Sequence, residues 1–282
     1  MNQLTPAKQA QIFNCLAEGC SVRSTARLVD CSINAVMRTF IKLGVACSAY
    51  QDKTFRNLKC KRLQCDEIWA FVGCKDKNAT EEKKAKGQGS VWTWTALDAD
   101  TKLVPCWFVG TRDGGAAYHF MHDLASRLAS RVQLTTDGHK AYLQAVEDAF
   151  GTEIDYAMLN KIYGNAETGP ETRYSPAQCM GAKKAAISGS PDFAHTSTSY
   201  AERQNLNLRM KNRRFTRLTN AFSKKAENHE YGVAITMMHH NFCRIHQTLR
   251  CTPAMEAGVA SHVWEAKDVI ALLNQKTIEK AA

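Results

Sequence analysis

CDEIWAFV, residues 65–72, is the stretch at which the chain changes from helical to strand periodicity. Residues 68–72 are rich in β-branched and aromatic side chains, and so are residues 91–97 and 103–109. Such stretches favour strands, and Asp98-Ala99-Asp100-Thr101 between the last two has the composition of a hairpin turn. The sequence therefore predicts three antiparallel strands in a meander.

The chain after this meander alternates between helical and strand patterns. We expect an amphipathic helix from Gly114 to Leu128, a short strand over residues 132–136, a helix from about 139 to 150 and an extended piece around 154–158. Three strands, a helix, a strand, a helix and a strand is the order of a ribonuclease H-like domain. The predicted fold class is α/β, with a mixed sheet and helices.

Residues 5–44 show a helical pattern in three pieces. Thr5 before Pro6 is typical of an N-cap, Ser21 or Ser24 is a candidate cap for the next helix, and apolar residues recur at helical spacing up to Gly44. The last two pieces match a helix-turn-helix, a motif that places its second helix in the DNA major groove. That helix would expose Asn34, Arg38 and Lys42, although a solvated three-helix cap gives the same pattern.

These patterns predict an all-α helix-turn-helix domain ahead of the α/β core. We place it at residues 1–47, followed by a basic linker at 48–64, a catalytic domain at 65–258 and a C-terminal helical tail at 259–282. The segment 159–195 is polar and rich in glycine, which indicates a flexible loop on the DNA side. The Lys- and Glu-rich stretch 75–89 is most simply an exposed loop.

Charge and cysteine content narrow the class of protein. The chain has 37 Lys and Arg against 27 Asp and Glu, a net charge of +10, and the excess lies in residues 1–64 and 202–225. A basic excess of this size favours a nucleic acid partner. The eleven cysteines form no Cys-x-x-Cys pair, so Cys60 and Cys65 are weak zinc candidates. Without a signal sequence or an apolar run of about 18 residues, we expect a cytoplasmic protein.

Three acidic residues stand in distinctive phrases: Asp66 in the opening stretch, Asp137 in Thr135-Thr136-Asp137-Gly138-His139, and Glu202 in Ser199-Tyr200-Ala201-Glu202-Arg203. In the predicted sheet the strands that carry Asp66 and Asp137 are neighbours, and Glu202 would join from a later helix. Clustered carboxylates repel each other unless a cation compensates them. Two Mg²⁺ ions, with Mn²⁺ as a substitute, would serve the two oxygens of a phosphodiester displacement.

Each acid also has an ordinary explanation. Asp137 before Gly138 is typical of a helix cap, and an isolated Glu202 is typical of a solvated helix. Asp66 and Glu67 are adjacent, so on a strand they face opposite sides and only one is expected at the site. We choose Asp66 as the ligand.

The phrases Asp66-Glu67-Ile68-Trp69, Thr136-Asp137-Gly138 and Tyr200-Ala201-Glu202-Arg203, followed by Asn241-Phe242-Cys243-Arg244-Ile245-His246 and Thr252-Pro253-Ala254-Met255, resemble bacterial insertion-sequence transposases of the Asp-Asp-Glu type. The similarity is greatest to the insertion-sequence-one family and covers about residues 65–258. It implies magnesium dependence, a nucleoid-associated bacterial enzyme, recognition of terminal inverted repeats in double-stranded DNA, and assembly as a homodimer or larger complex.

The resemblance also implies roles for single residues. Asp66, Asp137 and Glu202 match the acidic triad, and Arg209 matches the basic position after the glutamate, where relatives often have lysine. The basic residues around this helix are candidate DNA contacts: Arg203, Lys211, Arg213 and Arg214. His246 ends a family phrase and is interpreted as a brace behind the site. Relatives often carry a cysteine-rich zinc segment before the helix-turn-helix, which this chain lacks.

Two other functions remain open from the sequence. A non-catalytic helix-turn-helix regulator derived from a transposase would bind DNA without cleaving it, with or without magnesium. A nuclease for RNA–DNA hybrids would share the core fold but would not need a helix-turn-helix. The combination of a helix-turn-helix with the three acidic phrases favours a transposase.

Overall fold

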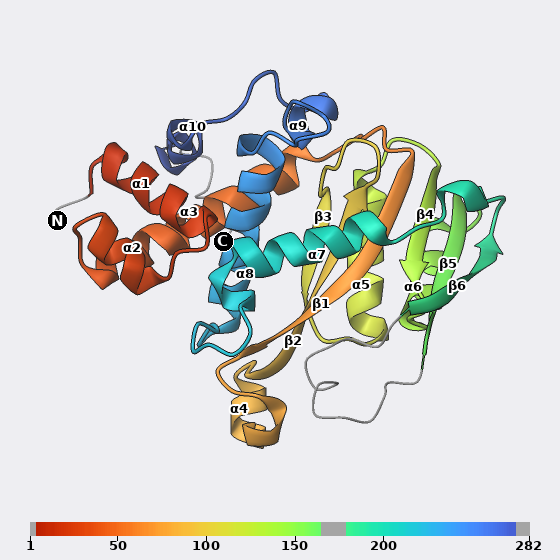
Figure 1. Cartoon of the computed structure of the whole chain (residues 1–282), viewed down its shortest axis with the longest axis horizontal. Coiled ribbons are helices and arrows are strands. Elements are labelled where there is room, and N and C mark those ends of the chain that lie inside the picture. Colours follow the sequence, from red (N-terminus) through yellow and green to blue (C-terminus); the bar gives the residue numbers. More distant parts are fainter. Residues whose placement is uncertain (1–3, 165–178, 275–282) are drawn as a thin grey trace.

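The computed structural model of the chain describes residues 4–164 and 179–274. Six strands form one mixed sheet in the order β3-β2-β1-β4-β5-β6 (Figure 1). Their bounds are β1 (Arg62–Val72), β2 (Gly89–Asp98), β3 (Cys106–Gly110), β4 (Val132–Asp137), β5 (Ile154–Tyr163) and β6 (Cys179–Ser188). The first three strands are antiparallel neighbours, β4 and β5 continue the sheet in parallel with β1, and β6 returns antiparallel to β5. This is the ribonuclease H-like arrangement, so the predicted fold class is confirmed.

Helices cover both faces of the sheet. α5 (Gly114–Arg127) and α6 (Ala141–Phe150) share one apolar core with β4 and β5, whereas α7 (Ser199–Lys211) and α8 (Ala226–Met238) meet β1 and β2 on the other face. Successive β1 side chains point to opposite faces, so Cys65 belongs to the first core and Ile68 to the second. Asp66 therefore faces α7, the helix that carries Glu202.

The N-terminal helices are α1 (Pro6–Ala17), α2 (Val22–Leu28) and α3 (Ile33–Thr54). The predicted cap at Thr5 is confirmed, since its side chain accepts a hydrogen bond from the Lys8 N–H, and Ser21 caps α2 in the same way. A four-residue turn, 29–32, joins α2 to α3. The three predicted helices are thus present in the predicted order.

α3 is longer than the sequence pattern indicated. It continues through residues 48–54, where we expected a linker, because the buried Gln51 amide donates to the carbonyls of Cys47 and Ala234. This second carbonyl belongs to α8, which packs along α3 (Figure 1). β1 also begins at Arg62, six residues before the predicted strand stretch 68–72. The N-terminal helices and the sheet share one apolar core, in which Phe55 of the expected linker stacks on Phe242.

Two segments predicted as loops contain regular structure. Residues 75–89 include η1 (Asp76–Asn78) and α4 (Glu81–Ala85). The stretch 159–195 supplies the end of β5, all of β6 and η3 (Phe193–His195), while residues 165–178 of the predicted flexible loop lie outside the described residues. The β6 sequence has weak strand propensity, and pairing with β5 fixes its conformation instead.

The remaining short elements follow the two long helices of the second face. They are η4 (Arg213–Phe215), η5 (His239–Cys243), α9 (Pro253–Glu256), α10 (Ala266–Ala271) and η6 (Leu272–Asn274). α10 lies in the predicted C-terminal tail and packs against α1, so both ends of the described chain lie in one region (Figure 1). Residues 275–282 of the tail lie outside the described part. No helix among the described residues has the length and apolar character needed to cross a membrane.

Candidate active site

A cleft opens where β1 and β4 separate. These parallel strands pair only at residues 62–64 of β1 and 133–135 of β4. Asp66 follows the last paired position of β1 by two residues, and Asp137 is the last residue of β4. The cavity of about 700 Å³ beyond this point, the acidic cleft, is lined by Asp66, Arg112, Asp137, Gly138, His139, Lys140, Leu159, Asn160, Lys161, Tyr163 and Glu202. The two aspartates predicted to meet across 71 positions of sequence therefore do meet.

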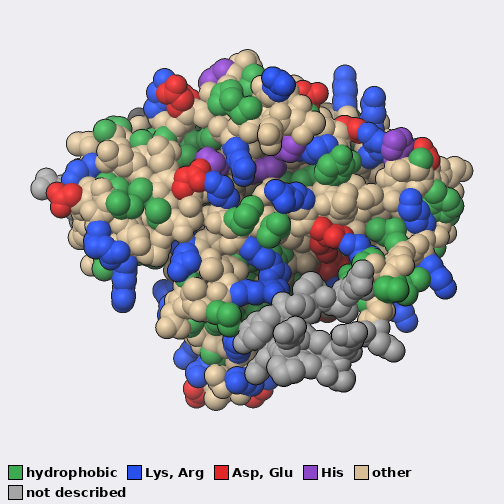
Figure 2. All heavy atoms as spheres, in the orientation of Figure 1, with side chains coloured by type: hydrophobic (Ala, Val, Ile, Leu, Met, Phe, Trp, Pro, Cys, Tyr) green, Lys and Arg blue, Asp and Glu red, His purple; other side chains and the backbone are tan. Residues whose placement is uncertain are grey.

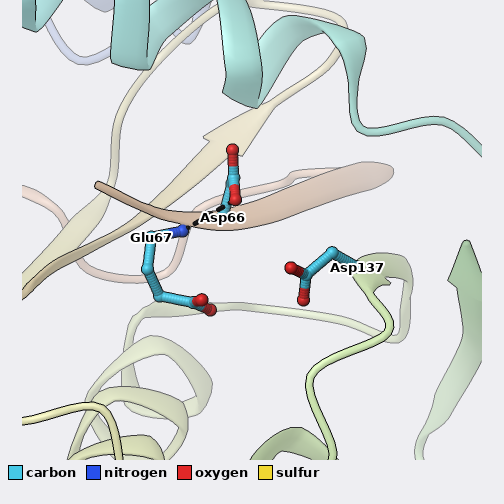
Figure 3. Close-up of side chains that lie close together, drawn as sticks. All are labelled: Asp66, Glu67 and Asp137. Atoms are coloured by element: carbon cyan, nitrogen blue, oxygen red, sulfur yellow. Dashed lines mark hydrogen bonds between the residues drawn. The ribbon is translucent and has the colours of Figure 1, made fainter. Parts of the chain in front are cut away.

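Asp66 is held in place by two hydrogen bonds. Its Oδ1 accepts from the Glu67 N–H at 2.9 Å and its Oδ2 accepts from Asn205 Nδ2 at 2.9 Å. Figure 3 shows this carboxylate pointing toward α7, the helix that contributes Asn205. Burial, with a further contribution from the charge of Asp137, raises the pKa of Asp66 to about 7. The α7 contact thus orients a carboxylate that is costly to ionise without a cation nearby.

Glu67 joins the same cluster, contrary to the expectation that only one of the adjacent acids reaches the site. Its side chain points away from α7 but turns back toward Asp137 (Figure 3), and ligand oxygens of Asp66, Glu67 and Asp137 lie within 4.8 Å of one another. The side chain is fully buried, and burial followed by the charge of Asp137 raises its pKa to about 7. Opposite strand faces do not separate these two acids, because the longer glutamate side chain reaches the open strand edge.

Arg112 provides the positive charge beside this cluster. Its Nε donates to Glu67 Oε2 at 3.1 Å, and its Nη2 lies 3.7 Å from Asp137 Oδ2. The guanidinium also stacks on Trp92, 4.7 Å from the ring centroid. One arginine therefore partly neutralises two of the three carboxylates, and Glu67 Oε1 remains buried without a hydrogen-bond partner among the described residues.

Asp137 does not cap the following helix. Its Oδ1 accepts from the His139 N–H at 3.0 Å, whereas α6 begins at Ala141 with Lys140 in the cap position. The helix-cap explanation is therefore wrong, and the short turn directs the second oxygen into the cleft. A Cβ at position 138 would lie 2.0 Å from Asn160 Oδ1, so a larger residue there would displace the Asn160 side chain.

Glu202 lines the acidic cleft but stays outside the three-carboxylate cluster. Its Oε1 is in contact with the ammonium of Lys161 and accepts a hydrogen bond from the Thr198 hydroxyl at 2.6 Å. The negative charge of Glu202 still contributes to the raised pKa of Asp66, although less than burial and Asp137 do. The structure thus places all three predicted acids around one cleft, with Lys161 bound to the third.

The donor set suits a hard divalent cation. Three carboxylates converge, two of them have pKa values raised to about 7, and one buried oxygen has no hydrogen-bond partner among the described residues. Magnesium and manganese take oxygen ligands, and a bound cation would favour the ionised form of each acid. Cys60 and Cys65 are buried thiols outside this cluster, and burial raises the pKa of both.

The predicted basic residues near α7 have different surroundings. Arg203 is exposed, and Arg209 is half-buried, with its pKa lowered by burial. Lys211 forms an ion pair with Glu18 of the N-terminal helices. Arg213 is half-buried in η4.

Arg214 packs inward, with its guanidinium 4.2 Å from the Phe40 ring centroid, and burial lowers its pKa to about 10. Its placement favours a role in packing α3 against the core over the predicted DNA contact.

The other predicted residues lie on the second face and the N-terminal helices. Asn34, Arg38 and Lys42 are exposed at successive turns of α3, as the helix-turn-helix pattern predicted. His246 lies beyond η5, where burial, Lys102 and Arg244 lower its pKa, and it does not line the acidic cleft. In the same stretch of sequence, Asn241 is fully buried and forms hydrogen bonds with both backbone groups of Val104.

Sequence reasoning missed Arg112, Lys161 and the role of Asn205. Arg112 follows the edge strand β3 and Lys161 lies near the end of β5, so neither stands in an acidic phrase. Asn205 offered one signal, since it follows Glu202 by three positions and so shares a helix face with it. The two basic residues were recognisable only once the sheet order was known.

No family model matches the chain, and no curated protein matches it. Among solved structures the chain is similar to a piggyBac transposase synaptic complex with hairpin DNA, at 11% identity over 95% of this chain and 69% of that one, with a TM-score of 0.44. It is also similar to a Mos1 transposase paired-end complex with the left transposon end, at 12% identity over 55% of this chain and 60% of that one, with a TM-score of 0.24. A Mos1 strand transfer complex is similar at 11% identity over 83% of this chain and 78% of that one, with a TM-score of 0.25. Likenesses this distant carry no conclusion about the activity of this chain.

Proposed function

We propose that the protein is a metal-dependent DNA transposase that binds the terminal inverted repeats of its own insertion sequence and cleaves and joins DNA strands. The observation that carries this proposal is the convergence of Asp66 and Asp137, from neighbouring parallel strands, in a cleft that Glu202 lines from α7. The sequence resemblance to insertion-sequence transposases supports the same assignment for these acids.

Within this function Asp66 and Asp137 would hold one divalent cation and Glu202 a second, once it separates from Lys161. The cations would neutralise the phosphodiester and activate the attacking oxygen. Asn205 keeps Asp66 directed at the cleft, and Arg112 does the same for Asp137. Water attack at the element end would break a phosphodiester bond and leave a 3′-hydroxyl. That hydroxyl would then attack a target phosphodiester, joining to the target 5′-phosphate and releasing the target's own 3′-oxygen as a hydroxyl. No covalent intermediate with the protein is required.

The charge distribution suits a DNA strand crossing the cleft. Figure 2 shows Lys and Arg side chains gathered across the middle of this face, around α7, with acidic side chains in a hollow beside it. Arg203 and Arg209 lie on α7 itself and would contact phosphates next to the acids. The exposed stripe Asn34, Arg38 and Lys42 would read the element end.

The test uses the full-length chain and a duplex that contains the inverted repeats flanking its coding region. We expect nicking and strand transfer with Mg²⁺ or Mn²⁺ and none with EDTA. Asp137→Asn should abolish both reactions and retain end binding. Cleavage that persists in EDTA, or full activity of Asp137→Asn, would contradict the proposal. End binding without cleavage in any metal would instead identify a non-catalytic regulator.

A further inference from the structure

A second groove lies further along the free edge of β1. This strand leaves β4 after Gln64, and its far end is held by a backbone bridge between Val72 and Ser223 and by a 2.8 Å hydrogen bond from the Gly73 N–H to the Ser223 carbonyl. Between these points a cavity of about 570 Å³ separates β1 from the segment that follows η4. Backbone contacts therefore join the two walls of the groove at this far end.

Three aromatic rings form one continuous wall. The centroids of Trp69 and Phe71 lie 5.8 Å apart, and those of Phe71 and Phe222 lie 4.5 Å apart. All three rings line the cavity, and all three side chains are only half-buried. We call this cavity the aromatic groove. Planar rings left accessible to solvent provide a stacking surface for other planar groups.

The charged residues that line the aromatic groove are all positive. Lys75 and Arg217 line it as exposed cations, Arg214 lines it from its packed position against Phe40, and the lining residues that the structure describes include no Asp or Glu. A fourth cation, the ammonium of Lys224, lies 3.6 Å from the Phe222 ring centroid. Aromatic rings interleaved with cations are characteristic of surfaces that bind single-stranded nucleic acid, because bases stack on the rings while cations contact phosphates.

Position relates the aromatic groove to the acidic cleft. Trp69 and Phe71 follow Asp66 on the same strand by three and five residues, which is roughly 10 to 17 Å at strand spacing. That span corresponds to about three to five nucleotides at the 3.4 Å spacing of a stacked DNA strand, and to fewer where the strand is extended. Both separations are odd, so the rings lie on the β1 face of Glu67, opposite that of Asp66, and a strand cut at the acids would reach them around the free edge of β1.

We propose that the aromatic groove binds unpaired bases of the DNA strand whose phosphodiester lies in the acidic cleft. The inference rests on the proposed function and extends it, since it assigns the protein a preference for DNA that is single-stranded beside the cleavage point. Amide side chains of Asn78 and Asn220, which also line the groove, would hydrogen-bond to base edges.

The experiment measures binding by fluorescence anisotropy in EDTA, so that no cleavage occurs. Two probes are compared: a blunt duplex of the element end and the same duplex with a single-stranded tail of about five nucleotides, matched to the span above. Wild-type protein should bind the tailed probe at least about fivefold more tightly, the low end of what stacking one base supplies. Phe222→Ala and Arg217→Gln should lose most of this preference and keep their affinity for the blunt duplex.

Tyr118→Ala is the control, because Tyr118 is a solvent-accessible aromatic residue on α5 outside the groove. Equal binding of both probes by wild type, or equal effects of Phe222→Ala and Tyr118→Ala, would overturn the groove assignment alone. Failure to bind either probe would count against the proposed function as well. A change of oligomeric state in Phe222→Ala with the tail preference intact would show an interface between copies instead, and so also overturn the assignment.

Tryptophan fluorescence gives a second test that does not depend on whether Phe222→Ala folds. An oligothymidylate should quench part of the tryptophan fluorescence of the wild type, and Trp69→Phe should remove that part. Identical quenching in the two proteins would mean that no base stacks on Trp69, which overturns the inference independently of the binding data.

Discussion

The ammonium of Lys161 and the hydroxyl of Thr198 both contact the same oxygen of Glu202, Oε1. Lys161 comes from β5 and Glu202 from α7, so the contact joins the two sides of the acidic cleft. Without a bound cation, the lysine supplies the positive charge that the third acid needs. A divalent ion at Glu202 would have to compete with this internal ion pair.

Removal of that competitor should strengthen cation binding. We expect Lys161→Met to bind Mn²⁺ several-fold more tightly than wild type, measured by calorimetry or by the electron paramagnetic resonance signal of free Mn²⁺. Lys86→Met removes the same charge from an exposed position at the end of α4 and should leave affinity unchanged. Weaker Mn²⁺ binding by Lys161→Met would mean that Lys161 supports the site and does not compete with the metal.

Arg112 should stabilise the fold mainly when no cation is bound. Arg112→Gln leaves the buried carboxylate of Glu67 without its charged partner, which costs roughly 2 kcal/mol of unfolding free energy. Added Mg²⁺ should restore much of that loss, as judged by the melting temperature with and without the ion. Arg56→Gln, which breaks an exposed pair with Asp52, should have little effect in either condition. A loss in Arg112→Gln that Mg²⁺ leaves unchanged would argue against cation binding at this cluster.

The exposed stripe of α3 should carry part of the electrostatic affinity for DNA. Arg38→Gln is expected to weaken binding and to reduce the slope of log K against log salt by about 0.9 if one phosphate contact is lost. Lys53→Gln changes an exposed residue in the last turn of the same helix and serves as control. Equal salt slopes for wild type and Arg38→Gln would remove Arg38 from the DNA interface.

His240 should make the fold sensitive to acid. Its Nε2 lies 2.9 Å from the Lys102 carbonyl, and burial lowers its pKa from 6.5 to about 4, with smaller contributions from His246, Arg244 and His239. The unfolded chain therefore binds a proton at a higher pH than the native one, so this residue reduces stability as the pH falls from 6.5 toward 4.

The comparison of wild type with His240→Gln isolates this effect, because glutamine can keep the bond to the Lys102 carbonyl. The free energy of unfolding of the wild type, relative to the variant, should fall by up to roughly 3 kcal/mol between neutral pH and pH 4. Urea titrations at a series of pH values measure it. Parallel pH profiles for the two proteins would show that His240 titrates normally.

Local sequence patterns predicted most of the elements because their signals were strong. The capping residue Thr5, the alternation in β1 and the periodicity of α5 each specify their structure with little help from the rest of the chain. β6 and the end of α3 were missed for the opposite reason. Their conformations depend on partners distant in sequence, namely β5 for the strand and α8 for the buried Gln51.

The residues of the candidate site that could be predicted are those that stand in distinctive local sequence motifs. Asp66 and Asp137 could be paired from the order of strands alone, and the structure brings them together. The basic residues that pair with the acids could not be predicted in this way. Arg112 and Lys161 are distant from the acids in sequence and come close to them only when the sheet has folded. Glu67 was set aside by strand alternation, a rule that holds for paired strands better than for an open edge.

The shared core of the N-terminal helices and the sheet has a geometric consequence. α3 is a helix of 22 residues, about 33 Å long, that carries Asn34 and Arg38 near its first turns and packs on α8 further along. If α3 contacts the bases of the element end, this rigid helix keeps the acidic residues of the cleft at a fixed distance from those bases. The number of base pairs between the recognised sequence and the cut bond would then be set by the rigid protein, and one inserted base pair would rotate the scissile phosphate away from the cleft.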